Sequence, residues 1–303
     1  MSVAVPQPHS RIEVASDDGA VLRVRRHGNP RAQVRLFVSH GNGFAIDGYV
    51  DFWSRFLADF DVVAFDMRSH GENPRGDAAH HDYAHMVADV DAVGRAARAE
   101  FGAKPAAGLF HSMSAQSALL QTMQGAPHFD ALLLFDPPNV PAPDHPAYQA
   151  MVGYEHKLAD WARDRRDHFD DPEQLAADYA GTRTGRRWAT GTSRLMARSV
   201  LRRADGGGWA LACPRELEAS MYLQGIPLGL WPQQKDVPVP VTLIGADPDG
   251  AYPAATGLSN RALAEEGGFD YRAVPGTSHL LQLEEPAACA NAALQVLARR
   301  GLR

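Results

Sequence analysis

The feature of this sequence that most constrains its fold is a regular alternation of short apolar runs with longer stretches of helical periodicity. Parallel strands are buried on both faces and need a crossover between them, so this alternation indicates a mostly parallel sheet with helices on both faces. The first two runs are expected to form a leading hairpin that turns at Asp17-Asp18-Gly19. Eight runs have the character of strands: 12–14, 20–26, 34–39, 62–65, 106–110, 131–135, 239–245 and 271–274.

Helices are expected between several of these runs. Over 82–101 apolar residues recur three or four positions apart, which is the spacing of a helix with one buried face. Asp82 is suited to cap the N-terminus of this helix, and Gly102 is suited to end it. The other predicted core helices span 113–124, 254–266 and 286–300.

The alternation stops between residues 138 and 236. This segment has prolines near its ends, several tryptophans and helical stretches, but no clear strand. We interpret residues 138–236 as a helical cap inserted between two parts of an α/β core, 1–137 and 237–303.

Composition excludes several classes of protein. The net charge of −6 argues against nucleic acid as a partner, and no stretch approaches the roughly 20 apolar residues of a membrane span. The N-terminus has no apolar core of a secretory signal. Cys213 and Cys289 have no metal-ligand spacing, which favours two buried thiols. We therefore expect a cytoplasmic protein without a metal.

Ser112 lies in the single tight turn between the strand at 106–110 and the helix at 113–124. A sharp strand-turn-helix elbow is how many hydrolases expose a nucleophilic serine. The segment 110–114 departs from G-x-S-x-G, because Phe110 and Ser114 stand where glycines are usual. Phe110 is the larger departure, since a small residue normally lets the helix and the strand approach closely there. His111 is expected to point away from the site.

Four segments of the chain resemble, in order, those of the α/β-hydrolase superfamily. They are His40-Gly41-Asn42-Gly43, Asp66-Met67-Arg68-Ser69-His70-Gly71, the Ser112 elbow, and Pro275-Gly276-Thr277-Ser278-His279. The HGNGF stretch and the residues 211–222 are also similar to those of a less studied, capped serine-hydrolase branch. The resemblance implies an eight-stranded α/β-hydrolase sheet.

The resemblance also implies roles for individual residues. Ser112 would be the nucleophile and His279 the general base. Without that chemistry, Ser112 would cap the following helix and His279 would be a histidine of a surface loop. Backbone N–H groups of Asn42 and Met113 would form the oxyanion hole, in which each donor lowers the barrier by about 3 kcal/mol. Asp66, Arg68 and His70 would support the loop beside the site.

The acid of the triad is left open by the sequence. Asp136 follows the strand after the elbow, which is one of two acid positions in the superfamily. Asp249 begins a D-x-x-x-P segment at the other position, and Asp247 lies two residues before it. The sequence favours Asp136 narrowly. The preference is narrow because an aspartate before a proline often serves only to end a strand.

The predicted cap is rich in arginine between residues 181 and 205, where seven arginines stand against one acid. Arginine binds carboxylates and phosphates, so an anionic substrate is compatible with this segment, but a solvated helix face is the more ordinary explanation. Aromatic residues of the cap would line a pocket or pack the cap: Trp188, Trp209, Tyr222 and Trp231.

These features predict a serine hydrolase that cleaves a small ester, lactone or related carbonyl compound through an acyl-enzyme, without a metal or an organic cofactor. Its partner would be a small-molecule substrate, and the sequence leaves its oligomeric state, including a homodimer, open. One alternative is carbon–carbon hydrolysis, perhydrolysis or a lyase reaction on the same residues. The other is a non-catalytic binding protein that kept the fold.

Overall fold

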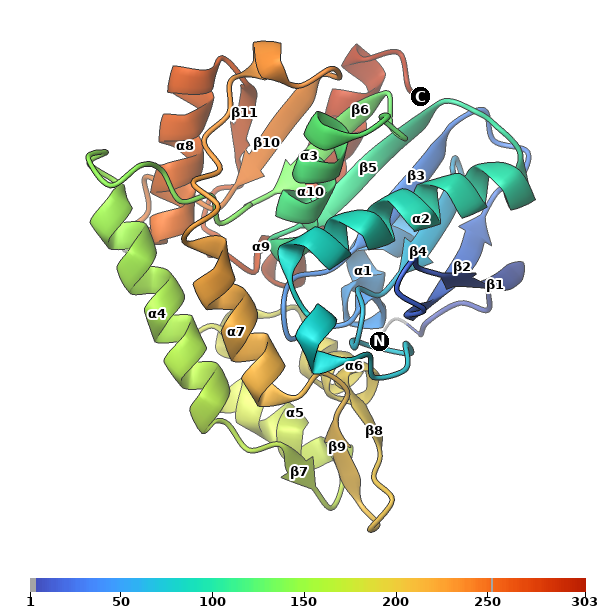
Figure 1. Cartoon of the computed structure of the whole chain (residues 1–303), viewed down its shortest axis with the longest axis vertical. Coiled ribbons are helices and arrows are strands. Elements are labelled where there is room, and N and C mark those ends of the chain that lie inside the picture. Colours follow the sequence, from blue (N-terminus) through green and yellow to red (C-terminus); the bar gives the residue numbers. More distant parts are fainter. Residues whose placement is uncertain (1–3, 252) are drawn as a thin grey trace.

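The computed structural model describes residues 4–251 and 253–303 and contains an eight-stranded sheet. The strand order is β1-β2-β4-β3-β5-β6-β10-β11 (Figure 1). β2 pairs antiparallel with β1 and β4, whereas the other neighbouring strands are parallel, which confirms the predicted sheet. The strands span Ser10–Ala15 (β1), Val21–Gly28 (β2), Arg35–Ser39 (β3), Asp61–Phe65 (β4), Ala106–His111 (β5), Ala131–Phe135 (β6), Val241–Gly245 (β10) and Asp270–Ala273 (β11).

The predicted core helices are present within one or two residues of their expected ends. The Asp82 carboxylate accepts a hydrogen bond from His85 N at 2.9 Å, and Gly102 ends the helix with φ 79°. The helices of the core are α1 (Val50–Trp53), α2 (Tyr83–Phe101), α3 (Met113–Gln124), α8 (Ala255–Gly267), α9 (Leu281–Glu284) and α10 (Pro286–Arg299). Short 3₁₀ turns span Ile46–Tyr49 (η1), Ser54–Phe56 (η2) and Ala78–His80 (η3).

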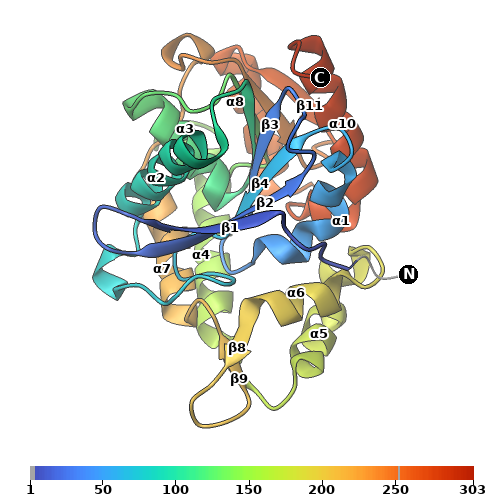
Figure 2. The same ribbon diagram turned by 90° about the vertical axis from the view of Figure 1, so that its right-hand side faces the viewer.

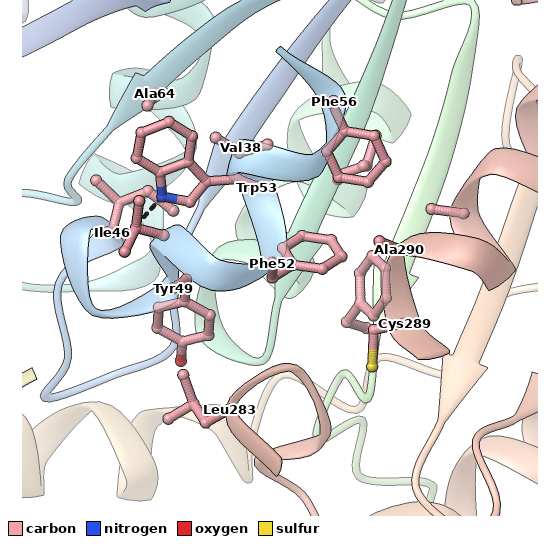
Figure 3. Packing of buried hydrophobic residues seen from close by; sticks show 14 of the residues in the cluster. Val38, Ile46, Tyr49, Phe52, Trp53, Phe56, Ala64, Leu283, Cys289 and Ala290 are labelled. Atoms are coloured by element: carbon pink, nitrogen blue, oxygen red, sulfur yellow. Dashed lines mark hydrogen bonds between the residues drawn. The ribbon is translucent and has the colours of Figure 1, made fainter. Parts of the chain in front are cut away.

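Two hydrophobic clusters cover the two faces of the sheet, because successive strand residues point to opposite sides. Leu36 of β3 belongs to the cluster that contains α1 and α10, whereas the next residue, Phe37, belongs to the cluster with α2, α3 and α8. Figure 3 shows the first cluster, in which Phe52 points toward Ala290 and Cys289 of α10 and Trp53 lies beside Ile46. The Trp53 indole donates a hydrogen bond to Ile46 O at 2.9 Å, so its polar edge is satisfied inside the core.

Most of the segment 138–236 lies beyond one end of the main sheet in both views, whereas its last residues run back along the sheet to the start of β10 (Figures 1 and 2). Its helices are α4 (Tyr148–Asp164), α5 (Pro172–Gly181), α6 (Thr192–Val200) and α7 (Arg215–Gly225), with 3₁₀ turns at Gly185–Arg187 (η4) and Gln234–Asp236 (η5). The expectation of no strand in this segment is wrong. A small antiparallel sheet, in the order β7-β9-β8, is formed by His168–Phe169 (β7), Leu201–Arg203 (β8) and Trp209–Leu211 (β9).

These strands could not be predicted from the sequence, because two or three residues are too few to show alternating polarity. The only local signal is the glycine run between β8 and β9. Gly207 and Gly208 both have positive φ, at 92° and 71°, so the run forms the turn of this hairpin.

Among the described residues, no helix is long and apolar enough to cross a membrane. Cys213 and Cys289 are both buried and unbonded to each other, as expected.

Candidate active site

Ser112 lies at the junction of β5 and α3, where the backbone turns sharply. Its φ of 54° falls in the left-handed region, which non-glycine residues rarely adopt. The turn is held by a hydrogen bond from Ser112 N to Phe135 O on the neighbouring β6, at 3.0 Å. Ser112 is only 4% exposed, so its hydroxyl faces a covered site rather than open solvent.

The bulky Phe110 is accommodated by a glycine two residues earlier. Gly108 is on the same face of β5, and a Cβ built on it would lie 2.4 Å from Phe110 Cε2. The Phe110 ring therefore occupies the space above Gly108 and packs edge-on against Phe65 and Phe129. Ser114 stands in place of the second glycine of G-x-S-x-G. Its Oγ accepts a hydrogen bond from His111 N and donates one to His111 O. These contacts keep a tight elbow without the usual glycines.

His279 lies between Ser112 and Asp136. Its Nε2 is 3.0 Å from Ser112 Oγ, and its Nδ1 is 2.7 Å from Asp136 Oδ2. The carboxylate accepts from Nδ1–H, so Nε2 is the unprotonated nitrogen, and it faces the Ser112 hydroxyl. The structure therefore brings together three of the residues that the sequence singled out, in the order that activates a serine hydroxyl.

Asp136 is held rigidly at the end of β6. It is fully buried and has a φ of 44°. Its second oxygen, Oδ1, accepts from Ala246 N at 2.9 Å and from Asn260 Nδ2 at 3.0 Å. Burial opposes ionisation of Asp136, but the hydrogen bonds from His279 and Ala246 outweigh it and lower the pKa of the carboxyl below its ordinary value. Asp136 is thus a carboxylate aimed at the imidazole.

Asp249 is not brought to His279. Its side chain is 78% exposed and pairs with Arg261 at 2.6 Å, because the loop after β10 runs outward to the surface. Asp247 instead supports the loop that leads to His279, since its carboxylate accepts from Gly276 N at 2.7 Å and from Asp249 N at 2.9 Å. Tyr252, inside the same D-x-x-x-P segment, lies outside the described residues.

The loop after β3 lies directly against the elbow. A Cβ built on Gly41 would be 3.1 Å from Ser112 Cβ, so glycine is needed for this close approach. The Asn42 side chain turns away and donates to Glu218 O of α7 at 2.8 Å. Met113 is the first residue of α3, where N–H groups have no acceptor within the helix. Gly41, the residue before Asn42, therefore approaches Ser112 from the loop after β3, and Met113 follows Ser112 at the start of α3.

The loop after β4 holds this arrangement in place. His70 Nε2 accepts from Gly43 N at 3.1 Å, and Asp66 Oδ1 accepts from Ile46 N at 2.7 Å. Arg68 forms a buried ion pair with Asp89 at 2.6 Å. Asp66 and His70 thus contact the loop beside the site, and Arg68 anchors the loop that carries them.

His111 does not point away from the site, so that expectation is wrong. Alternation along β5 places its side chain on the face opposite Phe110, and the loop carrying His279 returns over that face. His111 Nε2 lies 2.9 Å from His279 O, and Nδ1 lies 2.9 Å from the hydroxyl of Tyr49. Burial lowers the pKa of His111 to about 3. The neutral ring therefore donates from Nε2 to the carbonyl and accepts from Tyr49.

Sequence reasoning also missed the residues of the 138–236 segment that reach the site. The Tyr154 ring of α4 packs edge-on against His279, with ring centroids 5.9 Å apart. Arg187 pairs with Glu284 at 2.8 Å, and Glu284 accepts a hydrogen bond from Ser278 N at 3.0 Å. The segment 138–236 therefore contacts both His279 and the loop that carries it. Periodicity and motif spacing carried no signal for these contacts.

The arginines of residues 181–205 are largely engaged with protein groups. Arg194 and Arg198 pair with Glu173 of α5 at 2.8 and 3.2 Å. Arg202 donates to Gly71 O at 2.8 Å and so ties β8 to the loop after β4. Three of the seven arginines, Arg187, Arg194 and Arg198, therefore pair with acids of the protein, in line with the ordinary explanation of this stretch.

The chain matches a family model described as the alpha/beta hydrolase family over residues 36–292. The chain therefore belongs to the alpha/beta hydrolase family. No curated protein matches its sequence. Among solved structures it is similar to E-2-(acetamidomethylene)succinate hydrolase (20% identity, TM-score 0.75, 95% of this chain and 100% of that chain). It is also similar to the thioesterase domain from the curacin biosynthetic pathway (18% identity, TM-score 0.68, 94% and 100%). A third similar structure is an esterase from Thermogutta terrifontis (16% identity, TM-score 0.66, 96% and 99%). At these identities the structural likeness shows the fold alone.

Proposed function

We propose that this alpha/beta hydrolase is a serine hydrolase that cleaves a small ester, lactone or related carbonyl substrate through an acyl-enzyme. The observation that carries the proposal is the chain of contacts from Ser112 Oγ through His279 to Asp136, at 3.0 and 2.7 Å. A binding protein has no need of a hydroxyl, an imidazole and a buried carboxylate in this order.

In the proposed first half-reaction, Ser112 Oγ attacks the carbonyl carbon while its proton passes to His279 Nε2. The tetrahedral intermediate then collapses, the bond to the leaving oxygen breaks, and that oxygen takes the proton from His279. In the second half-reaction a water molecule loses a proton to His279 and attacks the acyl carbon. The bond to Ser112 Oγ then breaks, Oγ takes the proton from His279, and the acid is released. Asp136 stays ionised throughout and stabilises the imidazolium.

The oxyanion of each intermediate would accept hydrogen bonds from the N–H groups of Asn42 and Met113. Fixed backbone dipoles need no reorganisation as the charge develops, which makes them effective in a covered site. The close approach of Gly41 to Ser112 and the tether of the Asn42 side chain to Glu218 support this role.

We further propose that residues 138–236 act as a cap. Tyr154 covers His279, and the Arg187–Glu284 ion pair joins the segment to the histidine loop. A cap of this kind shapes the acyl or alcohol pocket and excludes water other than the attacking molecule.

Labelling with a fluorophosphonate probe, followed by peptide mapping, tests this function without knowledge of the substrate. The expected result is a covalent adduct on Ser112 in the wild type that is absent in His279→Ala and Ser112→Ala. Circular dichroism of the variants controls for folding. If the folded wild-type protein is labelled by neither small nor large fluorophosphonates, the proposal is contradicted.

A further inference from the structure

The α4 helix carries an acid in the middle of its buried face. The buried residues of α4 are Met151, Glu155, Ala159 and Ala162, which recur at the spacing of one helical face. Two of these alanines pack with Ala219 of α7, so the two helices lie close together along this face. Glu155 is only 2% exposed, in a row that is otherwise apolar.

The Glu155 carboxyl is buried without a compensating charge among the described residues. Within that part of the chain its Oε1 has no hydrogen-bond partner, and no salt bridge includes Glu155. The neighbouring buried acid, Glu218, shows the contrast, because it pairs with Arg165 at 2.9 Å. A buried polar group without a partner destabilises the fold, so such groups in natural proteins are frequently functional.

Three tyrosines lie near the Glu155 carboxyl. Tyr154 precedes Glu155 on α4, and Tyr222 of α7 packs against Ala159 and Ala162 of the same buried face. Burial, together with the nearby charge of Glu155, raises the pKa of the Tyr83, Tyr154 and Tyr222 hydroxyls. Tyr154 packs against His279, and the Tyr83 hydroxyl donates to Gln116 Oε1 at 2.5 Å. Gln116 is one turn after Ser112 on α3. Figure 1 shows α7, which carries Tyr222, between α4 and α2.

A carboxylate beside aromatic rings is the combination that recognises an organic cation. The carboxylate supplies the opposite charge, and tyrosine faces attract an ammonium group through their quadrupoles. A ligand cation would also offset the cost of ionising the buried acid, which no described residue does. A neutral alkyl group would gain nothing from Glu155.

On these grounds, and resting on the proposed function, we propose that Glu155, Tyr154 and Tyr222 form a subsite for an ammonium group of the substrate. The acyl or alcohol part of the cleaved compound would then carry a primary or substituted amine, whose positive charge is held beneath α4 while Ser112 attacks the carbonyl.

Binding of a probe cation tests the subsite independently of catalysis. Calorimetry would compare pentylammonium with pentanol, an uncharged molecule of equal length, on Ser112→Ala and on Ser112→Ala/Glu155→Gln. Glutamine keeps the size of the side chain, so the double variant is expected to fold. Loss of the ion pair should weaken pentylammonium binding by roughly tenfold or more and leave the weak binding of pentanol similar in both proteins.

A matched control is Ser112→Ala/Glu216→Gln, which makes the same substitution at an exposed position of α7. It should bind pentylammonium like Ser112→Ala. Equal affinity of pentylammonium for all three proteins, or no binding to any of them, would overturn the subsite. Absence of a fluorophosphonate adduct on Ser112 would overturn the proposed hydrolase instead, so the two failures are distinguishable.

Turnover gives a second readout. The ratio of kcat/KM for the nitrophenyl ester of an ω-aminoalkanoic acid to that of the alkanoic acid of equal length should fall by roughly tenfold in Glu155→Gln. Glu216→Gln should keep the wild-type ratio. An unchanged ratio in Glu155→Gln would count against the subsite.

Discussion

His279 Nδ1 lies 2.7 Å from Oδ2 of Asp136, an aspartate that follows β6, while the aspartate that follows β10 is bound to Arg261 at the surface. The acid next to the imidazole therefore comes from the strand beside the elbow strand. Its remaining oxygen is fixed by Ala246 N and by Asn260. This relationship separates the two acid positions that the sequence left open, and mutation can test it.

We expect Asp136→Asn to lower kcat by a factor of about 10⁴, because an amide holds the imidazole in the wrong tautomer. Asp249→Asn is the matched control, and it should keep near-normal activity because its partner is a surface arginine. Steady-state kinetics on any ester that the enzyme turns over, or the rate of fluorophosphonate labelling, measures both. A normal rate for Asp136→Asn would refute the assignment of the acid.

His111 is expected to act as a positioning residue through the carbonyl of His279. His111→Ala removes the hydrogen bond to that carbonyl and should slow labelling of Ser112 on the order of tenfold, because small misplacements of a general base are costly. Tyr49→Phe keeps the His111 ring and its bond to His279, so its effect should be smaller. Comparison of the pH profiles of labelling separates a misplaced base from a general loss of structure. Equal labelling by wild type and His111→Ala would disprove the role.

The fit of Phe110 above Gly108 predicts a specific loss of stability. Gly108→Ala places a methyl group where the Phe110 ring lies, and it should destabilise the fold by about 1–3 kcal/mol. Gly153→Ala, in the interior of α4 with no atom within 4 Å of the new Cβ, should instead stabilise it by about 0.5–1 kcal/mol. Urea unfolding of both variants gives the comparison. If Gly108→Ala is as stable as the wild type, the Phe110 ring can adopt another rotamer without loss, and the prediction is wrong.

Glu155 should make the stability of the protein depend on pH. Burial raises the pKa of its carboxyl from 4.5 to about 8 in the folded state. Because the folded protein holds this proton more tightly than the unfolded chain, stability is greatest below about pH 4.5 as far as this group is concerned and falls until about pH 8.

The groups that face Glu155 do not titrate in this range. They are Tyr83 of α2, Tyr222 of α7 and Tyr154 of α4 itself, and burial raises the pKa of all three hydroxyls. Glu155→Gln should therefore raise the melting temperature relative to wild type at pH 8 and have little effect at pH 5. A difference that is the same at both pH values would show that the carboxyl does not titrate as a buried group.

Much of this architecture is encoded locally. A buried strand, a turn with room for one serine and an amphipathic helix determine the elbow at Ser112 without reference to the rest of the chain. The same holds for the hairpin of β1 and β2 and for the Asp82 cap of α2. Strand alternation also predicts the face on which His111 lies, because residues 110 and 111 must point to opposite sides of β5.

What the sequence alone determined is therefore the order of strands and helices, the family resemblance, and the positions of Ser112 and His279 on loops at strand ends. Only the tertiary structure decided which aspartate meets His279, since Asp136 and Asp249 follow two adjacent strands and differ in where their loops lead. It also decided that Phe110 fits above Gly108 and that Glu155 has no partner for Oε1 among the described residues. The physical reason is that periodicity reports the face on which a side chain lies, whereas a hydrogen-bond partner, or the lack of one, depends on chain segments more than a hundred residues away.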